Sequence, residues 1–146
     1  MKVPHPFPYQ GSKRNIASEI LQYFPTSFNT LYESFAGSGA ITIAAASRSL
    51  GKKYCLNDLN KPLIDLWEMI VNDPERISDQ YEKLWSAQSE YPRSFYNKIR
   101  EKFNMTGRPD YFLYLLAGMM KMSQIGLIIA IPFLFRNFFI TLKSDS

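Results

Sequence analysis

The chain has 146 residues, close to the length of one average domain, so its length favours a single domain. With 46% hydrophobic and 21% charged residues it has the composition of a globular protein, which argues against a mainly disordered chain. Its net charge of +4 allows an anionic partner but is too small to demonstrate nucleic-acid binding. Cys55 is the single cysteine and cannot form an internal disulfide or anchor a structural zinc site by itself, which fits a cytoplasmic setting.

The first half of the chain predicts alternating helices and strands. Apolar residues at four-residue spacing predict a helix over about 13–24, with Ser12 as its N-cap. A short strand over about 31–35 is followed by a glycine turn and a helix that runs to about residue 50, where Gly51 would cap its end. A second strand over about 53–57 leads into a helix capped by Asn60. This order predicts a parallel βαβ unit, although only two strands are found.

The second half predicts helices and then changes character. Asp73 and Pro74 are typical of a helix start, with Asp73 as N-cap, and another helix is expected over about 94–104. The apolar run from Ile125 to Phe135 contains Pro132 and is too short to span a membrane, so no membrane partner is expected. Residues 118–140 show neither helical nor alternating periodicity. We interpret 125–146 as an aberrant apolar tail, with a buried core element as the alternative.

The strongest chemical signal is the turn Ala36-Gly-Ser-Gly39 between a strand and a helix, followed by Asp58 at the end of the next strand. Glycines let a ligand approach the backbone, and the helix N-terminus offers it free N–H groups. Asp58 could accept hydrogen bonds from both ribose hydroxyls of a nucleoside. A structural turn and a simple helix cap are the alternatives for these residues. Thr42 stands where a dinucleotide fold needs its third glycine, which weakens a nicotinamide-dependent oxidoreductase.

Three motifs in order carry a resemblance to a known family. PYQGSKR (Pro8 to Arg14), YESFAGSG (Tyr32 to Gly39) and NDLN (Asn57 to Asn60) resemble the Dam-type, or D12 class, DNA adenine-N6 methyltransferases. The resemblance covers about residues 5–116. It implies an α/β, Rossmann-like methyltransferase fold that binds S-adenosylmethionine, here incomplete, with the start of a helical target-recognition region. It divides the chain into a cofactor-binding part (1–72), a helical part (73–124) and the apolar tail (125–146).

The resemblance also implies roles for individual residues. Tyr9 would pack on the cofactor, Lys13 would meet its methionine end, and Asp58 would bind its ribose. The implied cofactor-binding residues are Tyr9, Gly11, Lys13, Phe35, Gly37, Gly39 and Asp58. A solvated first helical turn is the alternative for Lys13. Basic residues among aromatics predict a weak contact with double-stranded DNA, or else the solvated side of an amphipathic helix, at Arg93, Lys98, Arg100 and Lys102.

The family's Asp-Pro-Pro-Tyr motif is missing from the sequence. That motif holds the flipped adenine and directs its N6 lone pair at the methyl group. The chain contains no Pro-Pro pair, so no catalytic residue is assigned, and no metal site is expected. We interpret the chain as a fragment of a site-specific DNA adenine-N6 methyltransferase that is inactive alone. The alternative is a non-catalytic cofactor-binding subunit of a split enzyme, whose second chain supplies the motif.

Overall fold

The computed structural model describes residues 3–88, 90–118, 128–132 and 139–144. Its sheet is parallel, has the order β1-β2-β3, and consists of β1 (Phe28–Glu33), β2 (Gly51–Asp58) and β3 (Phe139–Ser144). The helices are α1 (Ala17–Ile20), the 3-10 helix η1 (Leu21–Tyr23), α2 (Ala40–Ser47), α3 (Lys61–Asn72), α4 (Pro74–Ala87), α5 (Pro92–Thr106), α6 (Pro109–Ala117) and a short helix at 128–132. The expected α/β class is therefore present, as a short parallel sheet with mostly helices around it.

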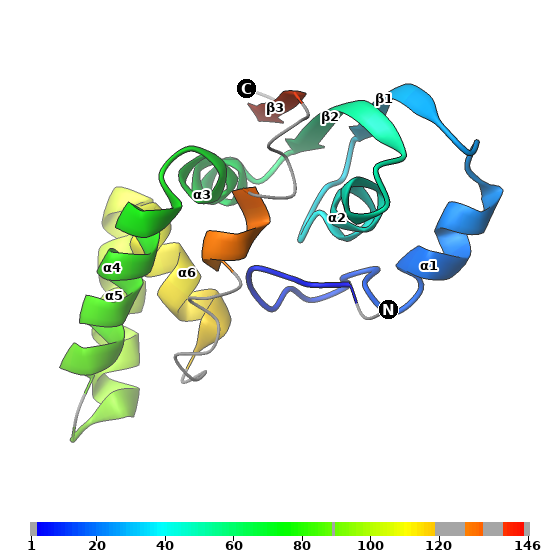
Figure 1. Cartoon of the computed structure of the whole chain (residues 1–146). Coiled ribbons are helices and arrows are strands. Elements are labelled where there is room, and N and C mark those ends of the chain that lie inside the picture. The colour runs from blue at the N-terminus through cyan, green and yellow to red at the C-terminus, as the bar shows by residue number, and fades with distance from the viewer. Residues whose placement is uncertain (1–2, 89, 119–127, 133–138, 145–146) are drawn as a thin grey trace.

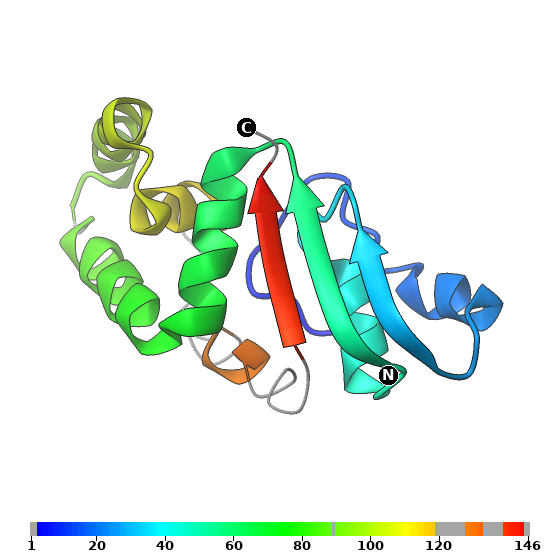
Figure 2. The ribbon, with the colours of Figure 1, turned by 90° about the horizontal axis from the view of Figure 1, so that it is seen from above.

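The sheet has helices on one of its faces. Figure 1 shows α2 and the N-terminal segment beneath the sheet, with α3 beside β3 and α4 to α6 at one end. Six of the eight residues of α2 are apolar, and five of these are buried together with Thr42, as expected for a helix enclosed on most sides. It contacts β1 and β2. In Figure 2 the opposite face of the sheet is turned to the viewer, and no described helix lies in front of it.

The helical part packs around α6, which contacts α3, α4 and α5. The helix predicted after Asn60 is α3, with Asn60 as its N-cap, and its buried face contains Leu63, Leu66, Trp67 and Ile70. The predicted start of α4 is also confirmed, because the Arg76 N–H donates to the Asp73 side chain at 3.4 Å. None of the described helices is long and apolar enough to cross a lipid bilayer.

Two predicted helix ends are wrong. The first helix begins only at Ala17, with Ile16 as N-cap, because the Ser12 hydroxyl is hydrogen-bonded to Ser38 instead of capping a helix. Gly51 does not cap α2 but begins β2, where a Cβ would collide with the ring of Phe28. Ser49, at φ 54°, takes the left-handed conformation expected for the glycine.

The C-terminal segment contains regular structure that the sequence did not indicate. β3 pairs with β2 over six residues, so that Leu142 lies opposite Leu56 and Ser144 lies opposite Asp58. Ile128 and Ile131 of the short helix are buried in the same core as Trp67. The partner strand β2 lies far away in the sequence, so no local pattern indicates this pairing. The remainder of the predicted tail lies outside the described residues.

Candidate functional site

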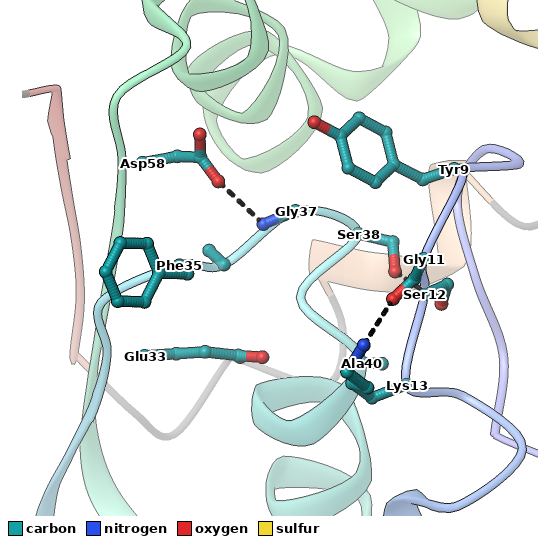
Figure 3. A pocket seen from close by; sticks show the side chains of 11 residues that line it. Tyr9, Gly11, Ser12, Lys13, Glu33, Phe35, Gly37, Ser38, Ala40 and Asp58 are labelled. Atoms are coloured by element: carbon teal, nitrogen blue, oxygen red, sulfur yellow. Dashed lines mark hydrogen bonds between the residues drawn. The ribbon is translucent and has the colours of Figure 1, made fainter.

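A cavity of about 280 Å³ opens at the carboxyl ends of β1 and β2. This is the edge at which open parallel sheets bind their ligands. The loop from β1 to α2 forms its floor, the end of β2 forms one side, and the N-terminal segment forms the other (Figure 3). The lining residues are Tyr9, Gly11, Ser12, Lys13, Glu33, Phe35, Ala36, Gly37, Ser38, Ala40 and Asp58. Sequence segments that lie far apart therefore meet at one place.

Asp58 holds the glycine turn in position. The Gly37 N–H donates to its Oδ2 at 3.0 Å, and the Asn60 N–H donates to its Oδ1 at 3.0 Å. Gly37 has φ 52°, a left-handed conformation in which glycine is favoured. A carboxylate has about four lone-pair positions on its two oxygens. Asp58 can therefore accept further hydrogen bonds from a ligand while it keeps both backbone contacts.

The N-terminal segment closes the other side of the cavity. The Tyr9 ring lies so close to Gly37 that a Cβ on that residue would be 3.1 Å from the ring. The hydroxyls of Ser12 and Ser38 share a hydrogen bond of 2.7 Å. Lys13 lies outside α1, so it is not in a first helical turn, and its Nζ donates to the Gly11 carbonyl at 3.0 Å. An exposed cation thus stands at the mouth of the cavity.

Glu33 is a site residue that the sequence analysis missed. It ends β1, is partly buried, and its Oε2 accepts from the Thr42 N–H at 3.0 Å in the first turn of α2. It takes the place of an N-cap side chain, because the N-cap residue is Gly39. Burial raises the pKa of Glu33, and hydrogen bonds from Thr42 and Ile41 counteract part of this rise. In the sequence, the feature that could have indicated Glu33 is its position at the end of the strand that leads into the glycine turn.

The structure brings together six of the seven implied cofactor residues, and Gly39 is the exception. Gly39 has φ 62° and lies behind the floor, where a Cβ would be 2.8 Å from the Trp67 ring and 3.1 Å from Leu56. Its lack of a side chain serves internal packing. Phe35, in contrast, is 83% exposed at the cavity, so its ring is free to contact a ligand.

The four basic residues implied in DNA binding lie on α5, well away from this cavity, at the end of the molecule opposite α1 (Figure 1). All four side chains are exposed. At 3.6 residues per turn, Arg93 and Arg100 lie together on one side of the helix and Lys98 and Lys102 on another. Lys102 borders the face of the buried Ile99, whereas Arg93 and Arg100 lie farther round the helix. The two pairs form two short basic rows and not one continuous face.

Arg108, the next basic residue along the chain, is engaged within the protein. Its guanidinium donates to both carboxylate oxygens of the buried Asp110 at 3.0 and 2.8 Å, and lies 4.4 Å from the centre of the Tyr111 ring. This residue is held at the start of α6 and belongs to neither basic row. Among the described residues, no cluster of three or more side chains is suited to hold a metal ion.

A parallel sheet with a glycine turn and an acid at its carboxyl edge is typical of nucleotide-binding α/β proteins, and comparison with known proteins identifies a specific family. Residues 9–140 match the D12 class N6 adenine-specific DNA methyltransferases, and the chain belongs to this family. The match confirms the resemblance. It also extends past residue 116, the limit of the resemblance seen in the sequence, to residue 140 in the apolar C-terminal segment. The family implies a Rossmann-like fold.

Individual relatives agree with the family. The chain is 29% identical over 111 residues to a DNA adenine methylase of Haemophilus influenzae, covering 73% of this chain and 37% of that protein. It is 27% identical over 105 residues to the type II methyltransferase M.MjaIII of Methanocaldococcus jannaschii, covering 66% and 36%. It is 28% identical over 102 residues to the type II methyltransferase M1.LlaDCHI of Lactococcus lactis subsp. cremoris, covering 70% and 33%. The chain spans about a third of the length of these relatives.

Proposed function

We propose that the cavity at the carboxyl ends of β1 and β2 binds S-adenosylmethionine, and that the chain is the cofactor-binding part of a site-specific DNA adenine-N6 methyltransferase. The observation that carries the proposal is the Asp58 carboxylate at the edge of the cavity, held by the N–H groups of Gly37 and Asn60. Family membership supports it. The cavity volume of about 280 Å³ is close to the lower end of the range for small-molecule sites, about 300–1,000 Å³.

The residues present fit this cofactor. Asp58 has lone pairs left for the two ribose hydroxyls, and Lys13 offers a positive charge to the carboxylate of the methionine end. Tyr9 and the exposed Phe35 offer aromatic surface, and Gly37 leaves the backbone open to close approach. When bound, the cofactor supplies the methyl group. This chain's residues bind and orient it, while the sequence offers no Asp-Pro-Pro-Tyr motif to hold the adenine.

The test is a calorimetric titration of the chain with S-adenosylmethionine and its demethylated product. Asp58→Ala removes charge-assisted hydrogen bonds and is expected to weaken binding by about 1.5–3 kcal/mol. Asp58→Asn keeps an oxygen for the Gly37 N–H but loses the charge, and should fall in between. Asp79→Ala, which removes an exposed α4 carboxylate paired with Lys83, is the control and should bind as the wild type does. Equal affinity of the wild type and Asp58→Ala for S-adenosylmethionine would show that Asp58 does not bind the cofactor.

The same titration distinguishes the methyltransferase proposal from the alternative of a nicotinamide-dependent oxidoreductase. A nicotinamide dinucleotide should bind more weakly than S-adenosylmethionine, because Thr42 replaces the third glycine of the dinucleotide fingerprint. Thr42 lies in the first turn of α2 and is fully buried. Its side chain therefore occupies space that a glycine at this position would leave free. Tighter binding of the dinucleotide would favour the oxidoreductase.

A second candidate, a cofactor-binding subunit that works with another chain, is favoured by the missing Asp-Pro-Pro-Tyr motif. Asp73 belongs to the only Asp-Pro pair, and it caps α4. We expect the purified chain to incorporate no labelled methyl group into duplex DNA, because it has no residues to orient the N6 lone pair. Adding a polypeptide that carries the motif should produce incorporation that Gly37→Val abolishes. Turnover by the repurified chain alone would contradict this.

A further inference from the structure

Two aromatic rings of the protein enclose the glycine turn. A Cβ on Gly37 would be 3.1 Å from the Tyr9 ring, and one on Gly39 would be 2.8 Å from the Trp67 ring. Both distances are shorter than ordinary van der Waals contact. Tyr9 belongs to the cavity wall, whereas Trp67 lies behind the turn and is fully buried. The rings therefore restrict the turn from two directions even without a ligand.

Gly37 is held at both of its backbone polar groups. Its N–H donates to Asp58 Oδ2 at 3.0 Å, and its carbonyl accepts from the Trp67 indole N–H at 3.0 Å. These two groups belong to the peptide planes on either side of the Gly37 Cα. Fixing both planes fixes the left-handed conformation of the residue between them, φ 52°. The Asp58 carboxylate is held by the same arrangement, since Gly37 is one of its two backbone partners.

Trp67 is itself fixed in place by its surroundings. It lies on the buried face of α3, and its ring meets the Phe7 ring edge-on at 5.8 Å between centroids. Phe7 in turn meets the Tyr9 ring edge-on at 6.2 Å. Tyr9 forms part of the cavity wall. One row of rings thus joins α3, behind the turn, to the N-terminal wall in front of it.

We propose that Trp67 is a positioning residue for the cofactor site. Its indole N–H orients the Gly37 carbonyl, and through Gly37 it sets the direction of the Asp58 carboxylate toward the ligand. Trp67 does not line the cavity, so its effect on the ligand is indirect. The inference rests on the proposed function, because the consequence concerns binding of S-adenosylmethionine in this cavity.

The test compares Trp67→Phe with two matched controls, using the demethylated product of the cofactor as the titrated ligand. Trp67→Phe keeps an aromatic ring but removes the donor to Gly37, and should raise the dissociation constant about 2- to 12-fold. Trp85→Phe removes an indole N–H that has no hydrogen-bond partner among the described residues. Ile70→Val removes one methyl group from the same buried face of α3. Both controls should bind within about twofold of the wild type.

A spectroscopic measurement separates positioning from a general loss of stability. The chain has seven glycines, so their amide signals can be assigned individually. Trp67→Phe should speed hydrogen exchange of the Gly37 amide, because the turn is no longer held at its carbonyl. Ile70→Val should lower the melting temperature without this local effect. Faster exchange confined to Trp67→Phe supports the inference even if that variant also melts earlier.

The outcomes are distinguishable from those of the proposed function. If the wild type binds neither S-adenosylmethionine nor its product, the proposed function fails, and the Gly37 exchange then decides the role of Trp67 by itself. Unchanged Gly37 exchange in Trp67→Phe overturns the inference. If the wild type binds, a dissociation constant that Trp67→Phe leaves unchanged, or that Ile70→Val raises equally, also overturns it.

Discussion

At the scale of single residues, the two acids of the cavity have different environments. Asp58 ends β2 and accepts from two backbone N–H groups. Glu33 ends β1, and burial raises its pKa because desolvation disfavours the charged form. The charged form of Glu33 is thus disfavoured by burial, and its hydrogen bonds offset only part of that cost. Both acids have backbone N–H partners, so burial, and not the number of donors, is the largest cause of the raised pKa of Glu33.

The raised pKa of Glu33 predicts a stability that depends on pH. Since the folded-state pKa lies above the ordinary value of 4.5, ionised Glu33 opposes folding, fully so above the folded pKa. Glu33→Gln keeps an oxygen for the Thr42 N–H and removes the charge. It should melt at a higher temperature than the wild type at pH 7, and the difference should vanish below about pH 4.5, measured by circular dichroism. Glu68→Gln, at an exposed position on α3, should show no such difference.

Gly39 offers a test of the packing behind the floor. Both Gly39 and Gly107 are left-handed, with φ 62° and 64°, but a Cβ on Gly107 would meet nothing within 4 Å. Gly107→Ala should therefore lose only about 1–2 kcal/mol of unfolding free energy, from backbone strain. Gly39→Ala adds the collision with Trp67 and should lose about 1–3 kcal/mol more. Urea denaturation measures both. Equal losses would mean that Trp67 moves aside freely.

At the scale of elements, local signals predicted more than distant ones. The glycine turn and the cap at Asp73 were predictable, because each depends on residues a few positions apart, and Asp58 was predictable from its place at the end of the second strand. The contact of Trp67 with Gly37 was not, since it spans 30 positions and depends on how α3 docks. The short α1 has the same cause, because Ser12 bonds Ser38, 26 positions away. β3 pairs with β2 across most of the chain, which no periodicity encodes.

The two basic rows of α5 predict a salt-dependent contact with duplex DNA. Lys98→Gln with Lys102→Gln removes one row, and Arg93→Gln with Arg100→Gln removes the other. If a row contacts two phosphates, its loss should reduce the slope of log affinity against log salt by about 1.8. Fluorescence anisotropy over a salt series measures the slope. Lys83→Gln, which removes a lysine paired with Asp79 on α4, is the control. Slopes that no double variant changes would favour the solvated-helix interpretation.

At the scale of the whole molecule, the sheet has one face without a described helix (Figure 2). Parallel sheets in proteins are almost always covered on both faces. Tyr32 is 72% exposed and lies opposite the half-buried Cys55 in the register, so the two side chains share one face. The structure therefore leaves aromatic surface of the sheet in contact with solvent.

This exposed face predicts self-association of the isolated chain. Light scattering after size exclusion should give an average mass above 16.9 kDa that rises with concentration. Tyr32→Lys places a charge on the face and should shift the average toward the monomer. Tyr23→Lys is the control, because Tyr23 is 91% exposed on η1, outside the sheet. A wild type that remains monomeric at all concentrations would show that the exposed sheet face does not cause self-association.

The cavity takes its walls from three stretches of chain, around Tyr9, Gly37 and Asp58, and no single stretch contains it. A ligand that binds there distinguishes the assembled chain from the unfolded one, so every bound molecule withdraws protein from the unfolded pool. At a hundred times its dissociation constant, such a ligand adds about 2.7 kcal/mol to the free energy of unfolding. The supply of S-adenosylmethionine in the cell would then set how much of this chain survives proteolysis, as well as how much of it is loaded.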